Sequence, residues 1–418
     1  MDDIGLLSAK QVSMVPFGLA HLFHSGSLMR EELLSVAILS MACTSSDKEE
    51  ADDASAKDSG APAAEEDIDG NGNGPSDGDG NDDTGESETV DRDGDGVWAD
   101  EDCDDTDPSM PVGDADCDGT PTADDCDDTD PSSTVRSEDA DCDGVPNTEA
   151  EAVCYRWNTD RADMSEGVWD GSVDTCDPGT PDPASVENAL RLVNLFRWMS
   201  GLPEVHTTPE LNERAQDCAL IMEAYGGLTH YPAETFECYT NSGAQAASMS
   251  NISPYAGVYS VDLYMSDPGN STTLGHRRWI LSNGLGPIGL GSTSNYSCMH
   301  VIGGSGADSA PWTAWPPPGV VPYELTRLAW ATLDQTGWSV QSDSMNLSGA
   351  TVTITRDDGA DLPVTVTQLG AYYGSLAAIS MIPSGWEAEP GRSYDVHVEV
   401  LGGVIDYTVD LVDCSAVE

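Results

Sequence analysis

The sequence predicts a multidomain protein with three parts: acidic calcium-loop repeats, a domain that opens with helices, and a small C-terminal antiparallel β-sandwich. About half of the 75 acidic residues lie between positions 47 and 149, where aliphatic residues are almost absent. From position 183 apolar residues recur at the spacing of amphipathic helices. Beyond position 321 apolar and polar residues alternate, which is typical of half-buried strands. The hydrophobic content of 39% is therefore low mainly because of the acidic part.

Residues 1–43 are predicted to be a signal peptide. An apolar stretch from 33 to 42 follows Arg30 and ends at Cys43, as in the h-region of an export signal. Ala42 before Cys43 is typical of lipoprotein signals, in which the cysteine becomes the lipid anchor, but Ser40 stands where such signals usually have leucine. Two destinations stay open: the cell envelope, as an outer-membrane lipoprotein, or the extracellular space after ordinary cleavage.

The acidic charge and the cysteines indicate which partners and which cellular compartment suit this protein. Residues 44–90 have no periodicity and are predicted to form a disordered acidic linker. A formal net charge of −59 argues against nucleic acid as a partner, because carboxylates and phosphates repel each other. Of the 11 cysteines, those other than Cys43 are even in number and lie in no zinc-type CxxC. They predict disulfides and an oxidising compartment.

Three D-x-D-x-D-G loops in residues 91–150 predict calcium binding. Calcium takes about six to eight oxygen ligands, and this spacing matches the first half of an EF-hand-type loop. The first two copies also place an aspartate at the loop's last position, whereas the third copy stops after its glycine. The expected ligands, copy by copy, are Asp91, Asp93, Asp95, Val97 and Asp102; Asp114, Asp116, Asp118, Thr120 and Asp125; and Asp139, Asp141, Asp143 and Val145.

Cysteines keep the register of these repeats. A cysteine after each complete loop and one inside the next loop predict two disulfides, Cys103–Cys117 and Cys126–Cys142. The pattern resembles thrombospondin type 3 repeats, and the run D-C-D-D-T-D-P resembles the MopE-type metal-binding repeats of bacterial surface proteins. The flanking residues lack helical periodicity, so the loops are expected to stand without helices.

The remaining cysteines are paired by proximity along the chain. Residues 151–182 are predicted to be a connector bracketed by one of these disulfides, and another would fasten the β-sandwich to the domain before it. The expected pairs are Cys154–Cys176, Cys218–Cys238 and Cys298–Cys414.

The domain at 183–320 opens with two predicted helices. Apolar residues from Val186 to Phe196 recur at helical spacing. Thr208 as N-cap and Pro209 at the first helical position begin the second helix, which Gly226 ends. A short helix is expected near 261–265. Beyond it, the C-terminal β-sandwich at 321–418 is predicted to contain strands near 350–355, 363–367, 376–382, 394–400 and 404–412.

This domain contains two distinctive runs: Leu228-Thr229-His230, after a helix, and Leu274-Gly275-His276-Arg277-Arg278-Trp279-Ile280-Leu281. The two runs resemble the CAP (SCP-like) superfamily of cysteine-rich secretory proteins, antigen 5 and plant pathogenesis-related proteins. The resemblance covers about 183–320 and implies an α-β-α sandwich. The family is better known for binding, including lipids in some members, than for a shared reaction.

The resemblance also implies a cleft with two histidines and two acids that can hold a divalent cation. It maps the histidines to His230 and His276 and one acid to Asp267, with Asp262 as the alternative. The other acid falls at Gln245, whose neutral amide is a weaker ligand than glutamate. Two roles therefore stay open for the histidines: ligands of zinc or another divalent cation, or structural hydrogen-bonding groups.

Two functions follow from these observations. In the first, a stalk of calcium-stabilised repeats presents a non-catalytic CAP-like domain to an unknown surface, lipid or small-molecule ligand, and a lipid anchor makes any membrane contact. In the second, the protein is a metal-dependent hydrolase that uses His230 and His276. Gln245 favours the first, and no serine lies in a G-x-S-x-G elbow.

Overall fold

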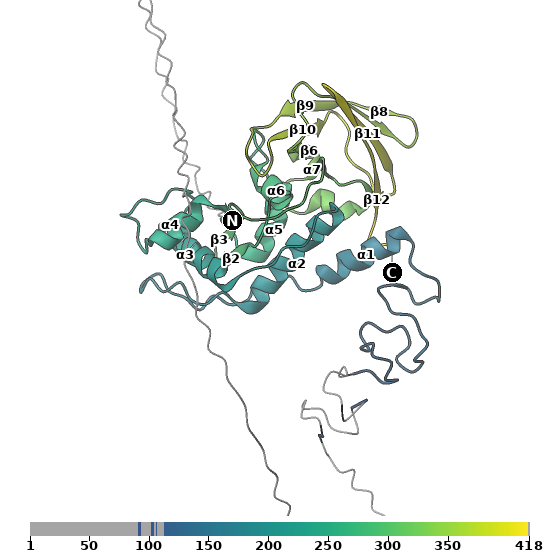
Figure 1. The fold of residues 1–418 in the computed structure, drawn as a ribbon, viewed down its shortest axis with the longest axis horizontal. Coiled ribbons are helices and arrows are strands. Elements are labelled where there is room, and N and C mark those ends of the chain that lie inside the picture. Colours follow the sequence, from purple (N-terminus) through teal and green to yellow (C-terminus); the bar gives the residue numbers. More distant parts are fainter. Residues whose placement is uncertain (1–90, 93–101, 104–105, 107–112, 417–418) are drawn as a thin grey trace, which may run out of the picture. The chain divides into compact units, whose positions relative to one another are not determined.

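The computed structural model describes residues 91–92, 102–103, 106 and 113–416. The signal peptide with Cys43, the linker at 44–90, and the loop positions Asp93, Asp95 and Val97 lie outside the described residues. The described chain is a mixture of helices and largely antiparallel sheets (Figure 1). Within it, no helix is long and apolar enough to cross a bilayer.

The helices begin directly after the third acidic loop. In chain order they are α1 (Glu149–Asp160), α2 (Pro183–Met199), α3 (Pro209–Tyr225), α4 (Asn241–Ser248), α5 (Gly257–Ser266), α6 (Gly275–Ile280), a short 3-10 helix η1 (Tyr323–Arg327) and α7 (Leu333–Thr336). The predicted start of α3 is confirmed, and the predicted helical stretch 186–196 lies within α2. Thr208 accepts a hydrogen bond from the backbone N–H of Leu211, and Gly226 ends α3 in the left-handed region at φ 68°.

Helix α1 overlaps the start of the connector that was expected at 151–182. Its first turn is closed by a capping box, in which Thr148 accepts the Glu151 N–H and the Glu151 carboxylate accepts the Thr148 N–H. Such a box satisfies backbone donors that a helix start otherwise leaves without partners. The helix buries Val153, Cys154 and Trp157, so this segment belongs to the folded core.

A three-stranded antiparallel sheet lies between two pairs of helices. Its strands are β1 (Ser250–Ser253), β2 (Gly289–Ser292) and β3 (Ser297–His300), in the order β1-β3-β2. Leu290 and Met299 face the core that contains α2 and α5 residues, whereas Ile252 and Cys298 pack with residues of α3 and α4. A side chain at Gly291 would collide with the α3 backbone, so this glycine permits the close approach of helix and sheet.

The C-terminal part contains two further sheets. One has the order β4-β6-β10-β9 and the other β5-β12-β11-β7-β8, with β5 and β12 parallel. The predicted strands are found within one or two residues, and two strands that begin before position 321 also join these sheets. The strands are β4 (Thr313–Trp315), β5 (Gly319–Pro322), β6 (Trp338–Ser342), β7 (Thr351–Arg356), β8 (Asp361–Leu362), β9 (Val364–Gln368), β10 (Ala377–Pro383), β11 (Ser393–Val400) and β12 (Gly403–Val412).

One hydrophobic core runs through these parts. It includes Trp157 of α1, Phe196 of α2, Trp315 of β4 and Tyr394 of β11, each at most 5% exposed. The rings of Phe196 and Trp315 meet edge to face at 5.5 Å between centroids, an arrangement that aromatic pairs prefer. The core is therefore continuous across position 320, where the sequence suggested a domain boundary.

Two buried arginines of α6 reach into the C-terminal part. The Arg277 guanidinium donates to the backbone oxygen of Gly337 at 2.8 Å, and also to oxygen atoms before α6. Arg278 donates to the backbone oxygens of Gly370 and Ser375 at 2.6 and 3.0 Å. Burial lowers the pKa of each guanidinium to about 10, which still leaves both charged at neutral pH.

The repeat disulfides are confirmed, but the other three predicted pairs are wrong. Cys103–Cys117 and Cys126–Cys142 form as expected. Pairing by proximity fails because packing brings distant segments together: α3 packs on β3, and α1 packs on β5, the neighbour of β12. The pairs found are Cys154–Cys414, Cys176–Cys238 and Cys218–Cys298.

We predict that the double change Cys154→Ser and Cys414→Ser lowers the free energy of unfolding by roughly 2–5 kcal/mol. This disulfide closes a loop with a sequence separation of 260 residues, so its loss enlarges the unfolded ensemble. Urea unfolding followed by tryptophan fluorescence measures the change. The matched control, Cys103→Ser with Cys117→Ser, lies outside the core and should leave that transition unchanged; an equal loss in both variants would contradict the prediction.

Candidate functional site

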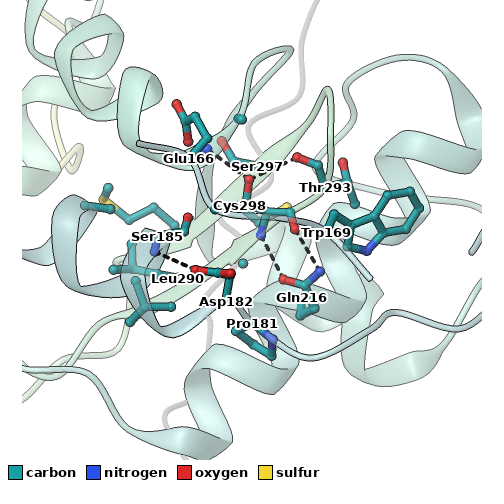
Figure 2. A pocket seen from close by; sticks show the side chains of 18 of the residues that line it. Glu166, Trp169, Pro181, Asp182, Ser185, Gln216, Leu290, Thr293, Ser297 and Cys298 are labelled. Carbon is teal, nitrogen blue, oxygen red and sulfur yellow. Dashed lines mark hydrogen bonds between the residues drawn. The ribbon is translucent and has the colours of Figure 1, made fainter. Parts of the chain in front are cut away.

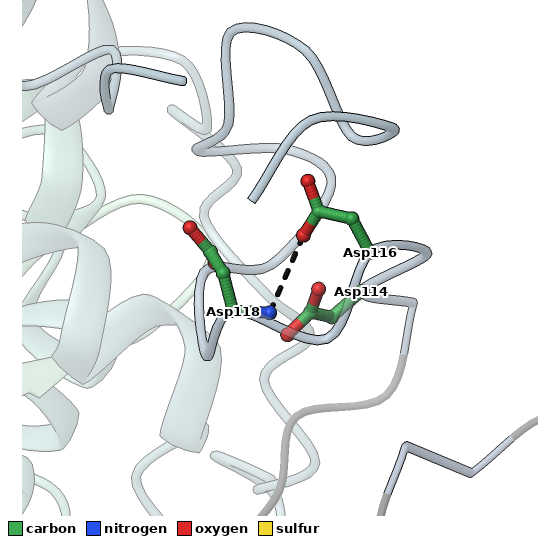
Figure 3. A group of neighbouring side chains, drawn as sticks. All are labelled: Asp114, Asp116 and Asp118. Atoms are coloured by element: carbon green, nitrogen blue, oxygen red, sulfur yellow. Dashed lines mark hydrogen bonds between the residues drawn. The ribbon is translucent and has the colours of Figure 1, made fainter. Parts of the chain in front are cut away.

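The second acidic loop gathers its carboxylates around one point. Ligand atoms of Asp114, Asp116 and Asp118 lie within 4.8 Å of one another (Figure 3). The Asp114 carboxylate also accepts the backbone N–H groups of Cys117 and Gly119, at 2.7 and 2.8 Å. These two bonds fold the chain around Asp114, and Gly119 has the positive φ, 97°, that such a turn requires.

Asp125, the last expected ligand of this loop, is not among the three aspartates whose ligand atoms lie within 4.8 Å of one another, but one of its carboxylate oxygens is buried. Asp125 is 3% exposed, and among the described residues its buried Oδ2 has no hydrogen-bond partner, as is also the case for Oδ2 of Asp116. Lost hydration raises the pKa of Asp116, and the charges of Asp118, Asp125 and Asp114 raise it further. Buried carboxylate oxygens that repel one another are what an oxygen-seeking divalent ion neutralises, so the residues fit calcium.

The third loop has the same geometry. Asp139, Asp141 and Asp143 bring ligand atoms within 4.8 Å, and the Asp139 carboxylate accepts the Gly144 N–H at 2.8 Å. Burial and the neighbouring Asp143 raise the pKa of Asp141, with a further contribution from Glu151. Glu151, whose carboxylate closes the capping box of α1, thus adds negative charge near this loop.

The remaining loop positions are placed as follows. Thr120 and Val145 lie in the second and third loops, where their N–H groups donate to Asp118 and Asp143, at 2.7 and 2.8 Å. Of the first loop, Asp91 and Asp102 are among the described residues. The third loop does not stand alone as expected, because α1 follows it directly.

In the CAP-like part, the structure brings Asp267 and His276 together. Nδ1 of His276 lies 2.8 Å from Oδ1 of Asp267, and Oδ2 of Asp267 accepts the His276 N–H at 3.1 Å. Asn270 adds a donor to Oδ1 at 3.0 Å. Asp267 is 1% exposed, and its partners compensate for the cost of burying the carboxylate. This pair fixes the orientation of the His276 ring, which also packs against Tyr264.

The alternative acid, Asp262, has a different role. Both of its carboxylate oxygens accept hydrogen bonds from the Arg161 guanidinium, at 2.8 and 2.7 Å. This bidentate ion pair joins α5 to the end of α1. Asp262 therefore has a structural partner of its own.

His230 and Gln245 make separate contacts. His230 is exposed, and its Nδ1 lies 2.8 Å from the backbone oxygen of Ala247, so this nitrogen carries the proton. Gln245 is exposed on α4, and its Oε1 accepts a hydrogen bond from Arg214 at 2.6 Å. Across the described ranges, only the two aspartate triplets gather three or more His, Cys, Asp or Glu ligand atoms within 4.8 Å.

We predict that Asp267→Asn lowers the free energy of unfolding by about 2–4 kcal/mol, because an amide nitrogen cannot accept the N–H of His276. Thermal and urea unfolding of the full chain measure the loss. Gln245→Ala, at an exposed position, serves as the control and should change stability by no more than about 0.5 kcal/mol. Equal stability of the two variants would show that the Asp267 carboxylate does not organise this region.

Comparison with known proteins identifies one domain. Residues 190–303 match the family model described as CAP, the cysteine-rich secretory protein family. No curated protein and no solved structure matches the chain. The matched segment lies inside the range 183–320 that the sequence motifs indicated and contains all four predicted cleft residues. The chain therefore contains a CAP domain.

Proposed function

We propose that this is an exported surface protein in which calcium-stabilised repeats present a non-catalytic CAP-type binding domain. The CAP domain and five disulfides agree with an oxidising, extracytoplasmic location. The proposal includes the acidic linker and an export signal, with Cys43 as lipid anchor or ordinary cleavage as the alternative. The ligand would be a surface, a lipid or a small molecule.

One observation carries the calcium part of the proposal. The buried Oδ2 of Asp125 has no hydrogen-bond partner in the part of the chain that the structure describes, and it belongs to a residue that sequence spacing assigns to the last ligand position. Leaving a buried carboxylate oxygen without a partner costs free energy, and a bound cation removes that cost. With calcium bound, the attraction of the Asp114, Asp116 and Asp118 carboxylates to the cation outweighs their repulsion of one another.

The non-catalytic part rests on what the cleft residues already contact. The Asp267 carboxylate already contacts His276 and accepts a hydrogen bond from Asn270. Gln245 stands in place of the second acid and accepts a hydrogen bond from Arg214. A metal hydrolase needs a set of ligands that leaves an open position for water. The four positions supply two histidines, one committed carboxylate and one amide, so we favour binding over hydrolysis.

We predict that calcium raises the thermal stability of the repeats in the full chain and that Asp125→Asn weakens binding at the second loop by about tenfold or more. The change removes one negative charge from the ligand set, and ligand charge is a main determinant of calcium affinity. Isothermal titration with calcium, after treatment with a chelator, measures the affinity.

Asp124→Asn is the matched control. Asp124 is the neighbour of Asp125 in the chain, its side chain is exposed, and it is not one of the proposed calcium ligands. This substitution should leave the affinity within about twofold. Unchanged melting with calcium or chelator, or equal effects of the two substitutions, would contradict the calcium proposal.

For the cleft, we predict that zinc titration of the calcium-saturated chain shows no site that depends on His230. His230→Ala should therefore leave zinc binding unchanged, and Gln245→Glu should not create a tight site, because Arg214 is positioned to neutralise the new carboxylate. Tight zinc binding that His230→Ala abolishes would favour the hydrolase alternative instead.

A further inference from the structure

The folded part from 151 to 416 carries its permanent positive charge on arginine alone, because no lysine follows position 57 in the chain. Within this part each arginine has an oxygen partner, which is a carboxylate, a backbone oxygen or a polar side chain. These arginines are Arg156, Arg161, Arg191, Arg197, Arg214, Arg277, Arg278, Arg327, Arg356 and Arg392. The cations are therefore committed to particular contacts.

Three of these arginines lie inside the fold and not on its surface. Arg197, Arg277 and Arg278 are each at most 1% exposed and donate to backbone oxygens. Burial lowers the pKa of each guanidinium to about 10, so all three stay charged at neutral pH. The surface therefore has fewer cations than the composition suggests, and most of its charges are carboxylates.

A disulfide holds two acidic segments of this surface together. Cys176–Cys238 joins the segment 163–182 to the loop before α4, with the two Cα atoms 5.0 Å apart. Asp174 and Asp177 on one side and Glu237 on the other are exposed. Among the described residues, none of these three acids belongs to an ion pair. Like charges are thus kept close without a cation that pairs with them.

A cavity beside the same segment has the same sign of charge. It has a volume of about 280 Å³ and lies between this segment, the starts of α2 and α5, and the β2–β3 hairpin (Figure 2). Glu166 and Asp182 are the only charged side chains among its lining residues. Glu166 accepts the Val258 N–H at 2.7 Å, and Asp182 accepts the Ser185 N–H at 3.0 Å. The cavity therefore adds negative charge to this side of the fold and no positive charge.

We propose that the folded part is adapted to a saline medium and needs dissolved monovalent salt, in addition to calcium, for its full stability. A large net charge of one sign destabilises a compact fold through self-repulsion. Salt reduces this repulsion, because the screening length falls from about 30 Å at 0.01 M to about 8 Å at 0.15 M ionic strength. The ions act by screening exposed carboxylates and not at one site, so the proposal does not depend on the calcium loops or on the cleft.

The test follows thermal unfolding of the calcium-saturated full chain by tryptophan fluorescence, from about 0.01 M to about 0.5 M sodium chloride. The melting temperature is expected to rise by roughly 5–10 °C over this range. Potassium chloride should have the same effect at equal ionic strength, because screening does not depend on which monovalent cation is present. A melting temperature that stays constant or falls, or a rise with only one of the two salts, would overturn the proposal.

Two matched substitutions separate repulsion from other effects of salt. Asp174→Asn removes an exposed carboxylate that lies among like charges, so it should raise the melting temperature at low salt by about 1–3 °C and have less effect at high salt. Asp358→Asn is the control, because this exposed carboxylate pairs with Arg356 and Arg392 at 2.8 and 2.9 Å. It should lower the melting temperature at low salt. A fall with Asp174→Asn, or a rise with both substitutions, would contradict the proposal.

Discussion

The burial of Arg277 is the constraint on which the folded part depends. This guanidinium is fully enclosed, and it can remain charged there only because it donates to Met265, Ser266 and Gly337 on several sides. A buried charge that loses its acceptors costs several kcal/mol. The positions of α5, α6 and the turn before β6 are therefore coupled, since moving any of them removes oxygen atoms from the same cation. These contacts join the CAP domain to the C-terminal sheets, which also share one hydrophobic core.

Local signals in the sequence were sufficient for α2, α3, the strands β7 and β9 to β12, and the repeat disulfides, but not for α1 or the sheet β1-β3-β2. Thr208, Pro209 and Gly226 mark the ends of α3 through backbone chemistry that acts within a few residues. The repeat disulfides could be predicted because cysteine and aspartate recur in one register. The other disulfides could not, because Cys154 and Cys414 meet only after α1 packs beside β5 and β12. Proximity in the chain contains no information about that packing.

In the candidate site, too, contacts between residues close in the sequence could be predicted, whereas contacts that depend on packing could not. The short spacing between Asp267 and His276 lets a loop and the start of α6 bring their side chains together, and the family resemblance selected both. Partners such as Arg214 for Gln245 and Arg161 for Asp262 depend on how helices pack, and nothing in the sequence indicates them.

The disulfide between α1 and the end of β12 also determines how the protein carries tension. A pull that enters through the acidic repeats reaches Cys154 and divides there into two covalent paths, one along α1 and the other into the chain at Cys414. The folded part is a closed ring at this point. If it is held at any residue within the ring, unfolding can lengthen the chain only by the shorter of the two arcs. Helix α1 is the first helix to bear the load, and the Cys154–Cys414 disulfide prevents its separation from the rest of the fold at that point.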